Sequence, residues 1–337
     1  MDQAKPKTLC DLIADKGPFI DVDAHASIAD ALTVMRDHKV SALVVAGEQG
    51  HWLGAGASCV TIANSAKQLL GIVTILDVIL HLANSVKLSL EGNTVTSIMH
   101  ATRIVDILGQ NTESLSLWVA DPSLELKLAL EPLAKGVHRV LVPIYASNES
   151  AHHHHQPPIS FKMCTQSDVI RFFLPLLTTD PAFSHLAHLP LSALTLPTVP
   201  SVVTRADPVM PALVRLAVQN RGAVPVVDRT GVLADTLSTS DFRALLWEKN
   251  AGHVAVEAVV TAMVGGMSVG DFLELLQERE GPARRVLKGV VSGSTRFVEA
   301  VRIVCENRIH RLWIVDGEGI PTGVVSLTDM IRCIRKM

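Results

Sequence analysis

The chain has 337 residues, of which 48% are hydrophobic and 19% charged, and its formal net charge is −3. This composition is typical of a globular chain of about two ordinary domains and excludes a disordered one. The small negative charge gives no electrostatic reason to expect nucleic acid or an anionic membrane as a partner. We also find no secretory signal in the polar first residues and no run long enough to span a membrane.

The cysteines indicate the redox compartment. They are five in number, widely scattered, and form no C-x-x-C pair. Free thiols in a reducing compartment are the simplest interpretation, which implies the cytoplasm or the nucleus.

The first predicted elements form a unit of helix, strand, strand and helix. Apolar residues from Ile28 to Met35 follow helical spacing. Two apolar strands are expected over 41–46 and 71–74, and a second helix is expected to start around Asp77. The same order recurs three times along the chain, which predicts an α/β fold built from internal repeats.

The repeated order predicts the elements of the other units. In the second unit these are a helix near 123–134, strands at 138–144 and 161–165, and a helix from Asp168. In the third they are a helix after Asp207, strands at 223–228 and 235–238, and a helix from Asp241. In the fourth they are a helix near 296–306, strands at 311–316 and 323–326, and a helix from Asp329.

The segments between units divide the chain into two pairs. Residues 175–200 are rich in proline, which breaks helices and disfavours central strands, so we interpret them as a connector. Residues 248–288 join the third and fourth units and contain a helical pattern at 268–280. The glycine-rich insertion 50–59 lacks P-loop spacing, and we favour a surface loop over a phosphate loop. The histidines within 152–158 favour a solvated loop over a metal site.

A Ser or Thr followed three residues later by Asp ends the second strand of every unit. The hydroxyl residues are Thr74, Thr165, Ser238 and Ser326, and the acids are Asp77, Asp168, Asp241 and Asp329. Any helix can use this pattern as a capping box. Its recurrence at four strand-to-helix turns favours a second role, because α/β layers bind ligands there. The Asp could accept hydrogen bonds from ribose hydroxyls, and the helix N-terminus favours an anion.

A His-Arg pair begins the first strand in the second and fourth units only. The pairs are His138 with Arg139 and His310 with Arg311. A charged strand edge is the alternative, but recurrence in alternate repeats favours a site. Arginine offers a fork of donors suited to phosphate. If the two pairs of units pack with pseudo-twofold symmetry, the four side chains could converge on a nucleotide phosphate.

These motifs resemble those of the CBS domain. Four such units, together with "GHWLGAGAS", "KGVHRVLVP", "FKMCTQSDVIRFF" and "VVSLTDMIR", resemble the gamma subunit of AMP-activated protein kinase, and more closely the plant gamma-like subunits of SNF1-related protein kinase. The resemblance implies an α/β (α+β) fold of four CBS units, paired into two Bateman modules in a pseudo-twofold disc. The implied bounds are 9–84, 94–175, 185–248 and 283–337, with 9–175 and 185–337 as the modules.

The resemblance also implies ligands and partners. The four Asp and four Ser or Thr residues above would hold ribose, and the two His-Arg pairs would hold the phosphates of AMP, ADP or ATP. The partners would be a Ser/Thr kinase catalytic (alpha) subunit and a beta subunit. Animal gamma subunits carry an arginine where we align Ser41, and Ala223 in unit three is also neutral, so neither position offers a positive charge to phosphate.

Three classes of function follow. The first is a non-catalytic, adenine-nucleotide-sensing kinase subunit, or a scaffold of that type that has lost sensing. The second is a CBS regulator of another enzyme that binds adenosyl ligands. The third, an enzyme, is disfavoured because the chain has no kinase, P-loop or metalloprotease signature and no carboxylate patterned beside His138 or His310. We predict no catalytic residue, cofactor or metal site.

Overall fold

The computed structural model describes residues 7–48, 60–61, 67–88, 95–111, 113–114, 117–146, 157–199, 201–219, 222–241, 253–280 and 289–337. The glycine-rich insertion 50–59 and the histidines of 152–158 lie outside the described residues. The helix expected from Asp241 falls, apart from its first residue, outside them as well.

The described strands form one small sheet for each unit. The strand orders are β1-β2-β4-β3, β5-β6, β7-β8-β9 and β10-β11-β12. The bounds are β1 Asp21–Asp23, β2 Ala42–Glu48, β3 Val60–Thr61, β4 Lys67–Thr74, β5 Arg139–Ile144, β6 Ser160–Thr165, β7 Val203–Thr204, β8 Ala223–Val227, β9 Leu233–Ser238, β10 Val290–Ser292, β11 Arg311–Val315 and β12 Pro321–Ser326.

The two antiparallel strands predicted in each unit are confirmed as β2/β4, β5/β6, β8/β9 and β11/β12. The sequence reading missed β1, β7 and β10, each of which pairs in parallel with the first predicted strand of its unit. These strands have only two or three residues, which is too short for an alternating pattern to stand out.

Helices follow the strands and cover the sheets. Their bounds are α1 Leu9–Leu12, α2 Ile28–His38, α3 Ile75–Leu88, α4 Val95–Ala101, α5 Ile104–Ile107, α6 Leu126–Ala134, α7 Gln166–Thr179, α8 Ser184–His188, α9 Val209–Val218, α11 His253–Val264, α12 Val269–Glu280, α13 Phe297–Asn307 and α14 Leu327–Arg335. No helix among the residues described is both long and apolar enough to cross a membrane.

The expected starts of the second helices were wrong. The second helix of a unit does not begin at its Asp: α3, α7 and α14 each begin two residues earlier, because the Ser or Thr is the N-cap and the Asp is the third helical residue. The proline-rich segment 175–200, expected as a connector, also contains helical structure. Pro175 lies within α7, and the segment contains two short 3-10 helices, Pro181–Phe183 and Leu191–Ala193, as well as α8.

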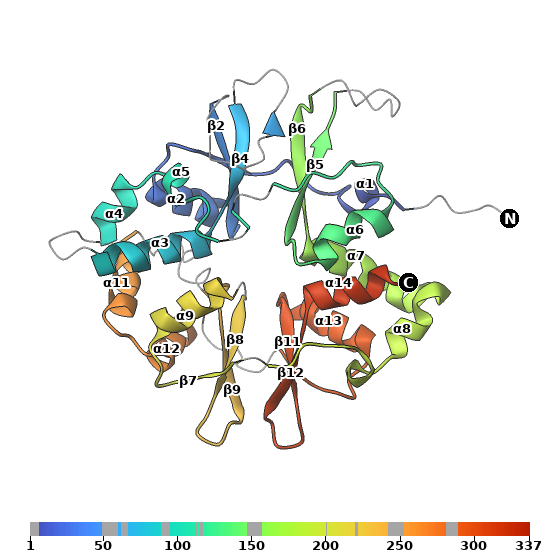
Figure 1. The fold of residues 1–337 in the computed structure, drawn as a ribbon. Helices are drawn as coiled ribbons and strands as arrows, with labels where there is room; N and C mark the ends of the chain where they lie inside the picture. Colours follow the sequence, from blue (N-terminus) through green and yellow to red (C-terminus); the bar gives the residue numbers. More distant parts are fainter. Residues whose placement is uncertain are drawn as a thin grey trace.

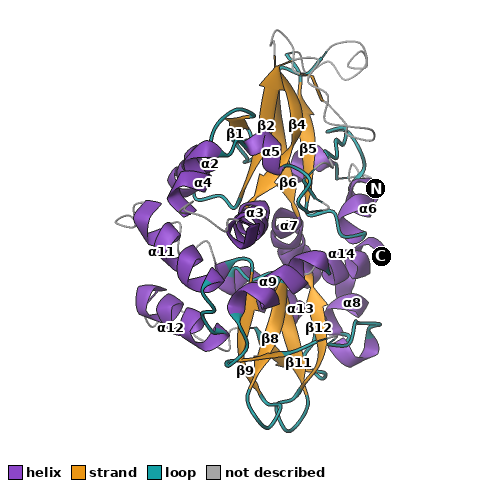
Figure 2. Ribbon diagram, turned by 60° about the vertical axis from the view of Figure 1, so that its left-hand side comes forward, coloured by secondary structure: helices purple, strands orange, loops and turns teal. Residues whose placement is uncertain are grey.

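The four units form a ring, with sheets meeting within each pair and helices meeting between pairs (Figures 1 and 2). Units one and two bring their sheets together through Val44, Ile72, Leu141 and Phe161. Units three and four do so through Leu233, Trp313 and Val324, and the Trp313 indole N–H donates to Thr236 at 2.8 Å.

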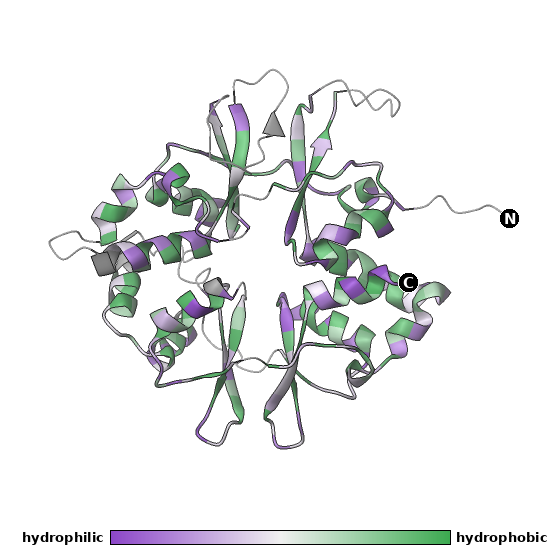
Figure 3. Ribbon diagram, viewed as in Figure 1, coloured by the Kyte–Doolittle hydropathy of each residue, from purple (hydrophilic) through white to green (hydrophobic). Residues whose placement is uncertain are grey.

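The two larger cores join the pairs to each other. One contains helices of units one and three, and the other contains helices of units two and four. Hydrophobic residues accordingly occur along the strands and in both groups of helices (Figure 3). Because each core takes residues from both pairs, burial of apolar surface holds the strand-to-helix turns of all four units around one centre.

Candidate functional site

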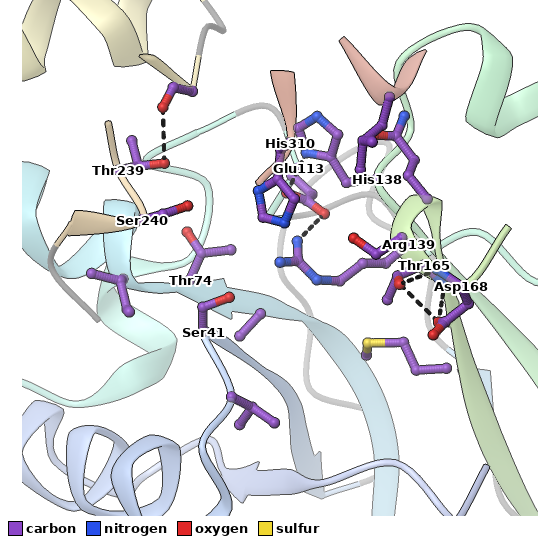
Figure 4. A pocket seen from close by; sticks show the side chains of 18 of the residues that line it. Ser41, Thr74, Glu113, His138, Arg139, Thr165, Asp168, Thr239, Ser240 and His310 are labelled. Atoms are coloured by element: carbon purple, nitrogen blue, oxygen red, sulfur yellow. Dashed lines mark hydrogen bonds and ion pairs between the residues drawn. The ribbon is translucent and has the colours of Figure 1, made fainter. Parts of the chain in front are cut away.

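A cavity of about 600 Å³ lies at the centre of the ring and is lined by residues of all four units (Figure 4). The strand-to-helix turns supply much of its wall, because the second strand of each unit ends toward the middle. Two further segments contribute, namely residues 16–20 ahead of the first strand and, between α5 and α6, Asn111 and Glu113.

Both His-Arg pairs line this cavity, namely His138 with Arg139 and His310 with Arg311. Sheet register explains why each arginine lies beside a turn. Arg139 is directly opposite Thr165, and Arg311 is directly opposite Ser326. The first residue of one strand therefore stands next to the helix cap at the end of its neighbour.

The register corrects one part of the alignment. In unit one the residue opposite the cap Thr74 is Ala42, so Ala42, and not Ser41, is equivalent to Arg139. Ser41 is equivalent to His138. In unit three Ala223 is opposite Ser238, as expected. Units one and three therefore present small neutral side chains where units two and four present arginine.

The Asp of each turn makes cap hydrogen bonds. Asp168 accepts from the Thr165 N–H at 2.8 Å and from the Thr165 hydroxyl at 2.7 Å. Asp329 makes the same pair of bonds with Ser326, and Asp241 accepts from the Ser238 N–H at 2.7 Å. The capping role is therefore present in the structure, and any ligand role must use the remaining lone pairs.

Asp168 lines the cavity with Thr165. The Lys16 ammonium donates to its Oδ2 at 2.5 Å, and the Arg171 guanidinium donates to its Oδ1 at 2.7 Å. Burial by itself raises the pKa of Asp168, but Lys16 and the cap hydrogen bonds outweigh it, and the net pKa is lowered. Asp168 is therefore ionised at neutral pH and stands where a ligand hydroxyl could reach it.

Asp77 has the same sequence context but a different environment. Its residue is fully buried. Its Oδ2 accepts from the Thr74 N–H and hydroxyl, both at 2.8 Å, and its Oδ1 accepts a short hydrogen bond from the Ser114 hydroxyl. Burial raises the pKa of Asp77, and these hydrogen bonds act against that effect. Both carboxylate oxygens are thus engaged away from solvent.

The remaining turn residues divide into two groups. Thr74 and Ser326 line the cavity. Four others are not among the described residues that line it, namely Asp77, Ser238, Asp241 and Asp329. Asp329 instead pairs with Arg332 at 2.8 Å.

Glu113 is a cavity residue that the sequence analysis missed. Its carboxylate accepts from the Arg139 guanidinium at 2.5 Å and lies 3.1 Å from the His138 Nδ1 (Figure 4). Burial by itself raises the pKa of Glu113, but the charges of Arg139 and His138 lower it to about 2. No carboxylate is patterned beside His138 in the sequence, but the fold brings Glu113 to it through a contact that spans 25 residues and belongs to no repeated motif.

Arg311 crosses from its own unit toward unit three. A Cβ atom added to Gly222 would lie 2.6 Å from the Arg311 Nη2. Gly222 is equivalent to His138 by register. A glycine at this position leaves room for the guanidinium at the cavity wall.

One side of the cavity is apolar. Ile20, Val40, Ala42 and Met163 contribute to its wall, and Met163 lies on β6, which ends at Thr165. The cavity thus combines an apolar surface, an ionised carboxylate beside a hydroxyl, and basic side chains.

Comparisons with known proteins agree with this architecture. Residues 283–336 match the CBS domain family. Two Arabidopsis thaliana proteins are similar along most of both chains: "SNF1-related protein kinase regulatory subunit gamma-like PV42b", 27% identical over 96% of this chain and 93% of its own, and PV42a of the same description, 28% identical over 97% and 94%.

A solved structure shares the fold. It is that of protein MJ1225 from Methanocaldococcus jannaschii, a candidate archaeal homologue of g-AMPK, which matches 97% of this chain and 100% of its own with a TM-score of 0.69 and 16% identity. The expected paired CBS architecture is confirmed at the level of the fold. The chain therefore carries a CBS domain and, over nearly its whole length, resembles the plant gamma-like regulatory subunits of SNF1-related protein kinase.

Proposed function

We propose that the central cavity binds an adenine nucleotide, and that the chain is a non-catalytic, gamma-like regulatory subunit of an SNF1-related or AMP-activated protein kinase complex. The observation that carries the ligand proposal is the meeting of two His-Arg pairs with the Thr165–Asp168 turn in one cavity. Its volume of about 600 Å³ lies in the range of small-molecule sites.

The chemistry of the walls orients the proposed nucleotide. Ribose hydroxyls would donate to Asp168 and contact Thr165, in competition with Lys16, which now holds one oxygen of that carboxylate. The base would lie against the apolar side near Val40 and Met163. The phosphates would then extend toward Arg139, Arg311 and the two histidines.

The proposal assigns the other turns a smaller part. Ser326 lines the cavity and would add a hydroxyl near the phosphates. Ser238, Asp241 and Asp329 would hold ribose only in clefts beside their own units. Thr74 and Asp77 would bind ribose only if the contacts of Ser114 and Asn111 were removed.

We place the four CBS units at the bounds inferred from the sequence, and the match at 283–336 supports the last of them. The free thiols among the described cysteines fit a reducing compartment, the cytoplasm or nucleus. Regulation would follow from linkage: a nucleotide that prefers one arrangement of the ring biases the kinase toward it, typically by about 1–3 kcal/mol.

Affinity capture from the native cell tests the partner. We expect a Ser/Thr kinase catalytic subunit, with or without a beta subunit, as the names of the Arabidopsis relatives suggest. Recovery of metabolic enzymes alone would favour the alternative, a CBS regulator of another enzyme that binds adenosyl ligands.

Calorimetry with AMP, ADP, ATP and adenosine tests the ligand. We expect each nucleotide to bind more tightly than adenosine, because only the nucleotides present phosphate to the arginines. A second candidate function is a scaffold that has lost sensing, which the engagement of Asp77 and Arg139 by the chain itself favours. Kinase capture without nucleotide binding would establish that candidate.

A further inference from the structure

We propose that Asn111, Glu113 and Ser114, here called the plug residues, act as an internal ligand. They occupy the turn of Thr74 and Asp77, here called the unit-one site, and they compete with phosphate for Arg139. This inference rests on the proposed function, since it concerns how the same cavity is regulated. It assigns a role to residues between α5 and α6 that belong to none of the repeated motifs.

Each plug residue contacts a group that the sequence analysis expected to bind nucleotide. The Ser114 hydroxyl donates to Asp77, where a ribose hydroxyl would donate. The Asn111 amide donates to the Thr74 hydroxyl at 3.2 Å. The Glu113 carboxylate binds Arg139 and His138, where a phosphate would bind.

The backbone holds the plug residues in place. The Ile72 N–H donates to the Ser114 carbonyl at 2.8 Å. A Cβ atom added to Gly71 would lie 2.3 Å from that carbonyl oxygen, so the close approach requires glycine. The Glu113 N–H also donates to the Asn111 side-chain oxygen at 2.8 Å. These hydrogen bonds hold Glu113 where its carboxylate contacts Arg139.

Because Glu113 is negatively charged, the plug residues compete with ligands that carry phosphate and not with neutral ones. Glu113 is ionised at neutral pH and supplies a negative charge to Arg139, so a phosphate must displace it or share the guanidinium with it. A ligand without phosphate has no such competition. The unit-one site, with Asp77 sealed under Ser114, remains closed to ribose in the same state.

Glu113→Gln tests the competition, because it keeps the size of the side chain and removes its charge. We expect inorganic pyrophosphate and AMP to bind about tenfold more tightly than to the wild type, while adenosine affinity stays unchanged. Glu131→Gln is the matched control: Glu131 also pairs with two basic side chains, Lys135 at 2.7 Å and Arg335 at 3.0 Å, but is not among the described residues that line the cavity. It should change none of the three affinities.

The outcomes separate this inference from the proposed function. Tighter pyrophosphate binding by Glu113→Gln with no AMP binding by either protein would support the competition and overturn the nucleotide site. Unchanged or weaker pyrophosphate and AMP binding, in a folded variant whose wild type binds AMP, would overturn the competition alone. Glu113→Asp gives a second reading if Glu113→Gln does not fold: a shorter carboxylate should release Arg139 in part and tighten pyrophosphate binding, and an unchanged affinity would again overturn the competition.

Discussion

The turns of units one and two contain the same Thr-x-x-Asp sequence and the same cap hydrogen bonds, but their carboxylates have opposite surroundings. Asp77 is 0% exposed, and its carboxylate accepts a hydrogen bond from the Ser114 hydroxyl. Asp168 faces the central cavity and is paired with Lys16 and Arg171. The difference comes from segments outside the motif, so a shared motif establishes a shared fold of the turn and not a shared ligand.

The largest expected effect concerns Glu113, which is one of the plug residues that occupy the unit-one site. At about 1.4 kcal/mol for each pH unit, a fall in pKa from 4.5 to about 2 is equivalent to about 3 kcal/mol of stability. Because the folded pKa is the lower one, this contribution is present above pH 4.5 and is lost as the pH falls toward 2. Urea unfolding at pH 7 and at pH 3.5 should show a smaller acid-dependent loss for Glu113→Gln than for the wild type. An identical loss in both proteins would mean that the ion pair with Arg139 does not stabilise the fold.

Asp77→Ala should come next in size. It removes a cap, which typically costs about 0.5–2 kcal/mol, and leaves the buried Ser114 hydroxyl without its acceptor, at about 1–3 kcal/mol more. We expect the free energy of unfolding to fall by about 2–3 kcal/mol while AMP affinity stays unchanged. Loss of AMP affinity in a folded Asp77→Ala protein would place the ligand in the sealed site and reverse the comparison.

Asp168→Ala should produce the opposite pattern. Loss of a charged acceptor for ribose should weaken AMP and adenosine alike, by about 1.5–3 kcal/mol, or roughly 10- to 150-fold. Asp329→Ala is the matched control, because Asp329 makes the same cap bonds but is not among the described cavity-lining residues. The control should lose stability and keep the affinity of the central cavity for nucleotide. Equal affinity losses in the two variants would indicate a general effect of the cap.

Arg311→Gln should have the smallest effect, about 1.5 kcal/mol on AMP and ATP binding with adenosine unchanged, because only phosphate uses the charge. The salt dependence of binding should also shrink. Combination with Arg139→Gln should be non-additive if both arginines hold one phosphate. The control is Arg332→Gln, because Arg332 is not among the described residues that line the cavity, and it should leave affinity unchanged. Equal losses of affinity for AMP and adenosine would mean that Arg311 stabilises the fold and does not bind phosphate.

The repeated motifs were enough to predict the paired strands, the turns and the basic pairs, because each repeats at a fixed place in a unit. Arg139 and Arg311 line one cavity, and both lie directly opposite a cap residue. These features depend on local pattern and on symmetry between units, which a single sequence records.

Features that depend on a single contact outside the repeated motifs could not be predicted. Glu113 and Gly222 belong to no repeated motif. Glu113 contacts Arg139, and Gly222 lies beside Arg311. Lys16 likewise reaches Asp168 across 152 residues. The signal that could have led to Glu113 is physical: two adjacent cationic or donor side chains near a buried centre require an anion, supplied by a ligand or by the chain.

A crystal structure of the wild-type protein with AMP tests the central claim most directly. The account predicts ribose on Asp168 and Thr165, phosphate between Arg139 and Arg311 with Glu113 moved off Arg139, and Ser114 still bonded to Asp77. Ribose on Asp77 with Ser114 displaced, or a central cavity without nucleotide at saturating AMP, would contradict it.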